Sequence, residues 1–193
     1  LPKSLAIIGG GVIGCEYACI FAALGVKVTI INSRSRLLAQ LDAEVGDALR
    51  NMITARLDIS VHLNVEVKEI KVEGEMASVS LSDDSTLHAD VVLFSAGRMG
   101  NTQGLGLEEI GVKLNKRGYV EVDKTFRTEV PTIFAAGDVI GFPALASTAM
   151  EQARVAVCQA FDLKYKQQVS SVLPYGVWTT PEIATVGETE DAL

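Results

Sequence analysis

The chain has 193 residues, of which 48% are hydrophobic, and it carries a net charge of −7. This length accommodates one sizeable domain with additional pieces, and the acidic charge excludes a general attraction to nucleic acid or to acidic membranes. The longest uncharged apolar run begins at Leu5 and ends before Glu16, so it is too short to cross a bilayer. No signal peptide is visible, and the three cysteines fit a reducing, cytoplasmic compartment.

The first predicted element is a β-strand that leads into a glycine-rich turn and a helix. Apolar residues 5–8 precede glycines at positions 9, 11 and 14, spaced G-x-G-x-x-G, and a helical pattern follows to about residue 24. This order is typical of dinucleotide-binding folds. Gly9 would permit the turn, Gly11 would let the backbone approach a diphosphate, and Gly14 would let helix and strand pack closely. The N–H groups at the helix start would bind the anion.

The following segments predict a parallel sheet with an antiparallel insertion. The β-branched run VKVTII at 26–31 predicts a second strand, parallel to the first. A helix capped by Asp42 is expected over 42–56, and a strand follows at 59–63. Alternating apolar and charged residues over 65–90 predict a β-meander. The next buried strand, at 90–95, would end at the same ligand crevice as the glycine turn.

The rest of the chain predicts a second group of elements. These are a loop at 99–106, strands at 119–122 and 132–136, a helix at 144–161, a polar linker at 164–168, and a strand-like tail with turns at 174–176 and 180–181. The second of these strands ends at Gly137 and Asp138. The Asp138 carboxylate could accept a hydrogen bond from a sugar or ribitol hydroxyl, or it could cap the following helix.

The end of the second strand bears on the choice between NAD and NADP. A carboxylate there hydrogen-bonds the ribose 2′-OH and repels a 2′-phosphate, but this chain has the neutral Asn32, followed by Ser33, Arg34 and Arg36. One Arg–phosphate contact contributes about 1.5–3 kcal/mol, so NADP could be accepted. NAD stays open because Asn32 could bind a ribose hydroxyl. The alternative is that both arginines are solvated loop charges.

Other chemically active residue types have competing structural interpretations. Glu16 lies two residues after Gly14 and is expected in the first helical turn, where it either complements the helix dipole or lies near the nicotinamide. Cys15 and Cys19 share a helical face and are interpreted as core side chains rather than a redox pair. The two histidines stand apart in the sequence, and no metal site is expected.

Three motifs together resemble the flavoproteins with two dinucleotide-binding domains, the family that includes dihydrolipoamide dehydrogenase and glutathione reductase. They are GGGVIGCE at 9–16, AGRxxNT at 96–102 and TIFAAGDV at 132–139, and they occur in the family's order and spacing. The resemblance covers essentially the whole chain.

The resemblance implies an α/β fold and a domain order. A Rossmann-like NAD(P)-binding domain, with a parallel sheet and an antiparallel β-meander, would cover 1–113. The C-terminal part of an FAD-binding domain would follow at 114–165, and the truncated start of a dimerisation domain at 166–193. The chain does not begin with Met and is interpreted as an internal piece of a longer protein. That protein is expected to bind FAD and to form a homodimer, without nucleic-acid or membrane partners.

The resemblance also implies which residues bind the two cofactors. The motif glycines would hold the nicotinamide nucleotide's diphosphate, Glu16 would lie near its carboxamide, and Gly97 would border the adenosine. Asp138 would hold the FAD ribitol, and the backbone at 145–146 would approach the flavin. The full candidate set is Gly9, Gly10, Gly11, Val12, Ile13, Gly14, Glu16, Asn32, Ser33, Arg34, Arg36, Ala96, Gly97, Arg98, Gly137, Asp138, Leu145 and Ala146. No catalytic residue is expected within the chain.

Within the family, GVIGCEYA at 11–18 and GDVIGFPALAS at 137–147 are similar to enzymes of the soluble transhydrogenase type. This implies hydride transfer between NADPH and NAD via FAD. One alternative is dihydrolipoamide dehydrogenase or another flavoprotein disulfide reductase, which a C-x4-C motif upstream would indicate. Another is a non-catalytic module that binds nicotinamide nucleotides. The isolated chain is expected to be inactive and to bind flavin poorly, because one FAD half-site leaves most cofactor contacts unmade.

Overall fold

The computed structural model describes residues 1–193, with the exception of the Glu73 side chain. The chain forms two compact units. Unit 1 combines Leu1–Gly97 with Pro174–Leu193, and unit 2 is Arg98–Leu173. These bounds differ from the expected domain bounds after residues 113 and 165, but compactness does not reveal which cofactor a segment binds, so that assignment stays a prediction. No helix in the described part of the chain has the length and apolar character needed to span a bilayer.

Unit 1 contains the predicted parallel sheet. Its strands and helices are β1 (Ser4–Ile8), α1 (Val12–Ala23), β2 (Lys27–Asn32), α2 (Ala43–Leu57), β3 (Ser60–Leu63) and β7 (Val91–Phe94). The strand order is β3-β2-β1-β7, and all three pairings are parallel. The chain leaves β1 toward β2 and later returns on the other side of β1, which makes the β1–β7 edge a topological switch point.

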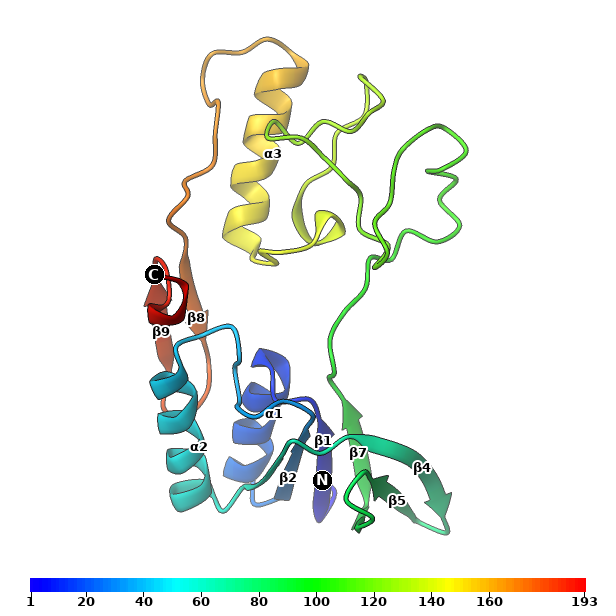
Figure 1. The fold of residues 1–193 in the computed structure, drawn as a ribbon, viewed down its shortest axis with the longest axis vertical. Coiled ribbons are helices and arrows are strands. Elements are labelled where there is room, and N and C mark those ends of the chain that lie inside the picture. The colour runs from blue at the N-terminus through cyan, green and yellow to red at the C-terminus, as the bar shows by residue number, and fades with distance from the viewer. The chain divides into compact units, whose positions relative to one another are not determined.

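The two faces of this sheet are covered by different elements, as alternating strand side chains require. Leu5 and Ile7 of β1 belong to the core cluster that includes side chains of α1 and α2. Ala6, between them, packs in a separate cluster with residues of the meander. Figure 1 shows the two helices on one side of the strands and the meander on the other. The fully apolar run of β1 is therefore explained by burial on both faces.

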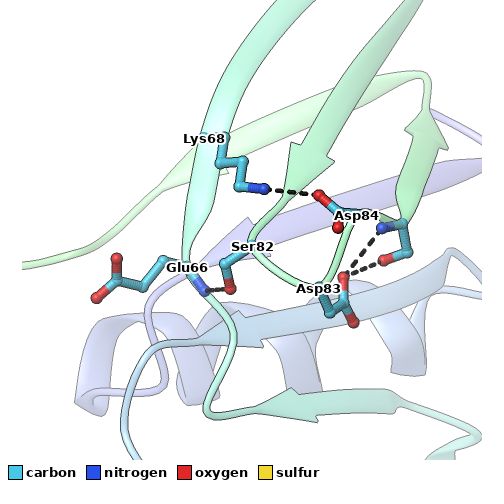
Figure 2. Close-up of polar contacts among 6 residues, drawn as sticks. Glu66, Lys68, Ser82, Asp83 and Asp84 are labelled. Carbon is cyan, nitrogen blue, oxygen red and sulfur yellow. Dashed lines mark hydrogen bonds and ion pairs between the residues drawn. The ribbon is translucent and has the colours of Figure 1, made fainter.

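The predicted meander is confirmed as three antiparallel strands, β4 (Val67–Glu73), β5 (Met76–Leu81) and β6 (Thr86–Ala89), in the order β4-β5-β6. The turn between β5 and β6 is held by side chains (Figure 2). The Asp83 carboxylate accepts from both the backbone N–H and the hydroxyl of Ser85, and Lys68 pairs with Asp84 at 2.8 Å. Asp and Ser side chains thus stabilise this turn of the meander.

The tail of unit 1 forms the hairpin of β8 (Pro174–Val177) and β9 (Ile183–Val186), followed by the short 3-10 helix η2 (Glu190–Ala192). The turn expected at 174–176 is wrong, because these residues pair with β9 and Val177 is buried in the α1–α2 cluster. The turn expected at 180–181 does connect the two strands.

Unit 2 contains the 3-10 helix η1 (Gly137–Ile140) and the helix α3 (Ala146–Ala160), which confirms the predicted helix. The strands expected at 119–122 and 132–136 are wrong, since these segments make only the isolated bridges Leu114–Val120 and Arg127–Phe134 in the described chain. Side chains hold turns beside both bridges. The Asn115 side chain accepts from the backbone N–H groups of residues 117 and 119, and Asp123 does the same for residues 125 and 127. The chain therefore turns away after a single pairing.

Candidate functional site

A crevice of about 510 Å³ lies in unit 1 at the carboxyl ends of the parallel strands, where the switch-point rule places ligands. Its lining includes the following members of the expected set: Gly9, Gly10, Gly11, Asn32, Ser33, Arg34, Arg36, Ala96 and Gly97. Val12, Ile13, Gly14 and Glu16 do not line it. The glycine turn, the end of β2 and the end of β7 therefore lie around one opening, as the sequence predicted.

The three motif positions differ in the geometric reason for which each is occupied by glycine. Gly9 has φ +112°, and a Cβ added there would lie 2.5 Å from the carbonyl oxygen of Ser95. A Cβ at Gly14 would lie 2.0 Å from the carbonyl oxygen of Gly9, so this glycine lets α1 pack against the turn. A Cβ at Gly11 would meet no heavy atom within 4 Å. The first and third glycines are therefore required by the fold, whereas the second faces open space beside the crevice.

The start of α1 can bind an anion there. Gly11 is the N-cap residue, with an extended backbone, and no side chain caps the helix. The first N–H groups of a helix have no partner within it, and they concentrate a partial positive charge. A diphosphate in the open space beside Gly11 would satisfy them. Val12, Ile13 and Gly14 do not line the crevice, so a role for them would rest on the backbone N–H groups at the helix start.

Asn32 holds the glycine turn and the next loop together. Its Oδ1 accepts from the N–H of Gly10 at 3.0 Å, and its Nδ2 donates to the carbonyl oxygens of Arg34 and Arg36 at 3.1 and 3.0 Å. The residue is only 7% exposed. The expected contact to a ribose hydroxyl stays a prediction, and it would have to use the second lone pair of Oδ1. Gly10 is likewise engaged, because its carbonyl oxygen accepts from the N–H of Leu38 at 2.8 Å.

Three charged residues line the end of the crevice where the motif would place the adenosine: Arg34, Arg36 and Glu66. Arg36 pairs with Asp191 at 3.0 Å, whereas Arg34 is exposed. Glu66 donates its backbone N–H to the hydroxyl of Ser82, and its carboxylate points away from the meander (Figure 2). Glu66 and its neighbours Val65 and Val67 also line the crevice, although the sequence motifs did not predict them. The signal was available, since they follow the carboxyl end of a parallel strand.

Glu16 does not lie in the first turn of α1, which contains no acidic residue. That expectation is wrong by one turn, because the helix begins at Val12. Its carboxylate instead accepts from the backbone N–H of Trp178 at 2.7 Å. One turn further on, the Cys19 sulfur accepts from the N–H of Thr180 at 3.4 Å. α1 therefore anchors the β8–β9 hairpin, and a role for Glu16 beside the nicotinamide stays a prediction.

The cysteines are free and buried, as expected for core side chains. Burial is the largest cause that raises the pKa of Cys15 to about 12, and it also raises the pKa of Cys19. Both thiols are therefore protonated at neutral pH, which argues against thiolate chemistry at this helix. Among the described side chains, no three His, Cys, Asp or Glu residues gather as metal ligands would.

The second set of expected residues lies in unit 2. Arg98 and Asp138 line a separate crevice of about 510 Å³ and pair with each other at 2.8 Å. Tyr119 donates its hydroxyl to the carbonyl oxygen of Arg98. Gly137 has φ +79° and donates its N–H to the buried Gln152 side chain at 2.7 Å. Leu145 is the N-cap residue of α3 and Ala146 is its first residue.

Comparison with protein families matches residues 1–158 to the model of the pyridine nucleotide-disulphide oxidoreductases. Among curated proteins, the chain is 46% identical over 192 residues to the soluble pyridine nucleotide transhydrogenase of Marinobacter nauticus and 43% identical to that of Pseudomonas putida GB-1. In both cases the match covers 100% of this chain but 41% of the relative. The chain therefore spans less than half the length of these relatives.

The chain is also similar to solved structures. The HOCl-induced flavoprotein disulfide reductase RclA of Escherichia coli, in its Cu(II) complex, is 31% identical, with a TM-score of 0.90 over 99% of this chain and 44% of that one. LpdA of Mycobacterium tuberculosis is 32% identical, with a TM-score of 0.91 over 99% of this chain and 41% of that one. The α/β fold expected from the sequence is confirmed.

Proposed function

The chain belongs to the family of pyridine nucleotide-disulphide oxidoreductases, and we propose that it supplies the nicotinamide-nucleotide site of an FAD-dependent enzyme that moves hydride between NADPH and NAD. The observation that carries this proposal is the open space beside Gly11, next to an uncapped helix start at the switch point of the sheet. This arrangement fits a diphosphate group.

The chain's own residues would bind and orient the nucleotide. The N–H groups at the start of α1 would hold the diphosphate, and the loop after β2 would receive the adenosine ribose. The end of β7, at Ala96 and Gly97, closes the crevice on its other side. Because Gly9 and Gly14 keep turn and helix in contact, these donors are already in place before the nucleotide binds, which reduces the ordering cost of binding.

The adenosine end favours the transhydrogenase activity over the alternatives. Hydride exchange between NADPH and NAD requires that the site accept nucleotides with and without a 2′-phosphate. Asn32 is neutral, so the carboxylate that would repel a 2′-phosphate at this position is missing, and Arg34 and Arg36 line the same end. The relatives named soluble pyridine nucleotide transhydrogenase are 43–46% identical to this chain.

Unit 2 would supply part of the FAD site in the complete protein. Asp138 and its partner Arg98 are each 56% exposed, so the Asp138 carboxylate is available to a ribitol hydroxyl. The backbone at Leu145 and Ala146 starts α3, where N–H groups could approach an electron-rich ring edge. When bound, the flavin supplies the hydride-accepting chemistry, while the protein supplies orientation. We assign 1–113 to nicotinamide-nucleotide binding, 114–165 to FAD and 166–193 to a dimerisation domain.

The surface of α3 supports a partner segment for unit 2. Met150, Val157 and Phe161 recur at helical spacing and are 54%, 51% and 73% exposed. An apolar stripe of this kind marks a contact surface. The missing part of the FAD domain would cover it in the complete polypeptide, which we expect to be a cytoplasmic homodimer.

A flavoprotein disulfide reductase is the second candidate, because the similar RclA of Escherichia coli is described as one. A C-x4-C motif in the polypeptide before residue 1 would favour it. An assay of NADPH-dependent reduction of an NAD analogue by the complete polypeptide separates the two candidates. Transhydrogenation without a disulfide substrate supports the first, and activity that requires a disulfide contradicts it.

The cofactor-binding part can be tested separately. Arg34→Ala and Arg36→Ala should weaken the binding of NADPH more than that of NADH, because the 2′-phosphate loses a charge-assisted contact. If neither substitution changes the ratio of the two dissociation constants, the role in 2′-phosphate binding is wrong.

A further inference from the structure

We propose that Asp191 lowers the affinity of the crevice for NADPH relative to NADH, by engaging the Arg36 guanidinium that a 2′-phosphate would use. Asp191 is thus a residue that sets cofactor preference from outside the binding site. This inference rests on the proposed binding of nicotinamide nucleotides and adds a determinant that lies far from the glycine motif in the sequence.

Two contacts attach η2 to the loop that carries the arginines. The backbone N–H of Glu190 donates to the Asp42 carboxylate at 2.7 Å, and the Arg36 guanidinium donates to the Asp191 carboxylate at 3.0 Å. Asp42 is the N-cap residue of α2, yet its side chain makes no capping bond to that helix. The expected N-cap position of Asp42 is confirmed, but its carboxylate binds η2 instead of capping the helix. Together the two contacts dock η2 against both ends of the loop between β2 and α2.

The two arginines of this loop differ in what they can offer a ligand. Both line the crevice, and Asp191 does not. Among the described residues, the Arg34 guanidinium has no bonding partner, whereas Arg36 is ion-paired, with 29% of its side chain exposed. Asp191 therefore reaches Arg36 from outside the crevice and compensates its charge while leaving Arg34 available.

The consequence differs for the two nucleotides. A 2′-phosphate that approaches Arg36 must share the guanidinium with Asp191 or displace it, and it experiences the repulsion of a second anion at contact distance. NADH has a neutral 2′-hydroxyl, which gains little from Arg36 and is little affected by Asp191. The ion pair therefore lowers affinity selectively for the phosphorylated nucleotide. Such a balance suits a site that must bind and release both nucleotides.

The test measures the dissociation constants of NADPH and NADH with the complete polypeptide that contains residues 1–193. Asp191→Asn retains the shape of the side chain and removes its charge. We expect the dissociation constant for NADPH to fall about twofold to fivefold, the range of an exposed ion pair, and that for NADH to change by less than about 1.5-fold. Glu190→Gln is the matched control, because this exposed neighbour contacts the loop through its backbone N–H, and it should leave both constants unchanged.

A double variant shows whether Asp191 acts through Arg36. In an Arg36→Gln background, Asp191→Asn should produce no further selective gain for NADPH. In the wild-type background, the gain should shrink at high ionic strength, because salt screens exposed charges.

Three results would overturn the inference: an unchanged ratio of the two constants in Asp191→Asn, an equal change in both, or a gain that persists without Arg36. If the wild-type protein binds neither nucleotide, the proposed function fails as well. A different outcome would leave the proposed function standing and show that this inference alone is wrong. In that outcome the wild-type protein binds both nucleotides, Gly11→Ala abolishes binding, and Asp191→Asn leaves the ratio of the two dissociation constants unchanged.

Discussion

Replacement of Gly11 by alanine separates the binding role of the glycine turn from its structural role. The added methyl group would meet no protein atom within 4 Å, and Gly11 has φ −81°, which alanine adopts readily. Alanine is a poorer N-cap residue than glycine, which destabilises the fold, but it also lowers the entropy of the unfolded chain, which stabilises the fold. Because these effects oppose each other, we expect the free energy of unfolding to change by less than about 1 kcal/mol.

The same methyl group would stand where the diphosphate must approach the start of α1. Loss of two charge-assisted hydrogen bonds, each contributing about 1.5–3 kcal/mol, removes about 3–6 kcal/mol of binding free energy. Because about 1.4 kcal/mol corresponds to tenfold in affinity, the dissociation constants for NADH and NADPH should both rise by more than about 100-fold.

Gly14→Ala is the matched comparison, because here the methyl group meets the protein itself. It would lie 2.0 Å from the carbonyl oxygen of Gly9 and 2.9 Å from the hydroxyl of Ser95. The turn and α1 must separate to admit it, which costs about 1–3 kcal/mol or more, as overpacking does elsewhere. This variant should therefore lose stability as well as affinity.

Urea denaturation and calorimetric titration of both variants with NADH and NADPH check these expectations. The reasoning is refuted if Gly11→Ala binds either nucleotide within about threefold of the wild-type constant. It is also refuted if Gly14→Ala is as stable as the wild-type protein.

Asn32→Asp should lower the free energy of unfolding by about 2–4 kcal/mol at neutral pH, because a carboxylate cannot donate to the carbonyl oxygens of Arg34 and Arg36. The same change at the exposed Asn64 is the control in urea denaturation, and equal effects of the two changes would contradict this role of Asn32. Because burial raises the pKa of Cys15 to about 12, the unfolded chain releases this proton at lower pH than the folded chain. The free energy of unfolding should therefore fall as pH rises above about 9, by up to about 1.4 kcal/mol per pH unit from this group, and Cys15→Ala should flatten that dependence. The 193-residue chain alone should lose FAD during gel filtration, and stoichiometric retention of FAD, read from its absorbance, would contradict the half-site assignment.

The local geometry of the glycine turn was predictable from the sequence, because the glycine spacing and its flanking apolar runs are contained in one short segment. The parallel pairing of β1 and β2 was also predictable, because the connection between them has the length of a crossover helix. The strands expected at 119–122 and 132–136 failed for the opposite reason. Short apolar segments permit an extended conformation, but a strand also needs a neighbouring segment that stays alongside it, and here the chain turns away.

The contacts that modify the site could not be predicted from local patterns. The bonds from Asn32 to two carbonyl oxygens depend on the conformation of the loop that follows it. The contacts of Trp178 with Glu16 and of Asp191 with Arg36 join positions 162 and 155 residues apart. No periodicity or propensity relates such positions, so the contacts of the tail with α1 and with the loop after β2 became visible only in the folded chain.

A crystal structure of the protein with NADPH would show whether the glycine turn binds the nucleotide. We expect the diphosphate beside Gly11 at the start of α1 and the 2′-phosphate at the end of β2, near Arg34. An empty crevice at saturating NADPH, or a nucleotide bound with its diphosphate away from Gly11, would contradict this expectation.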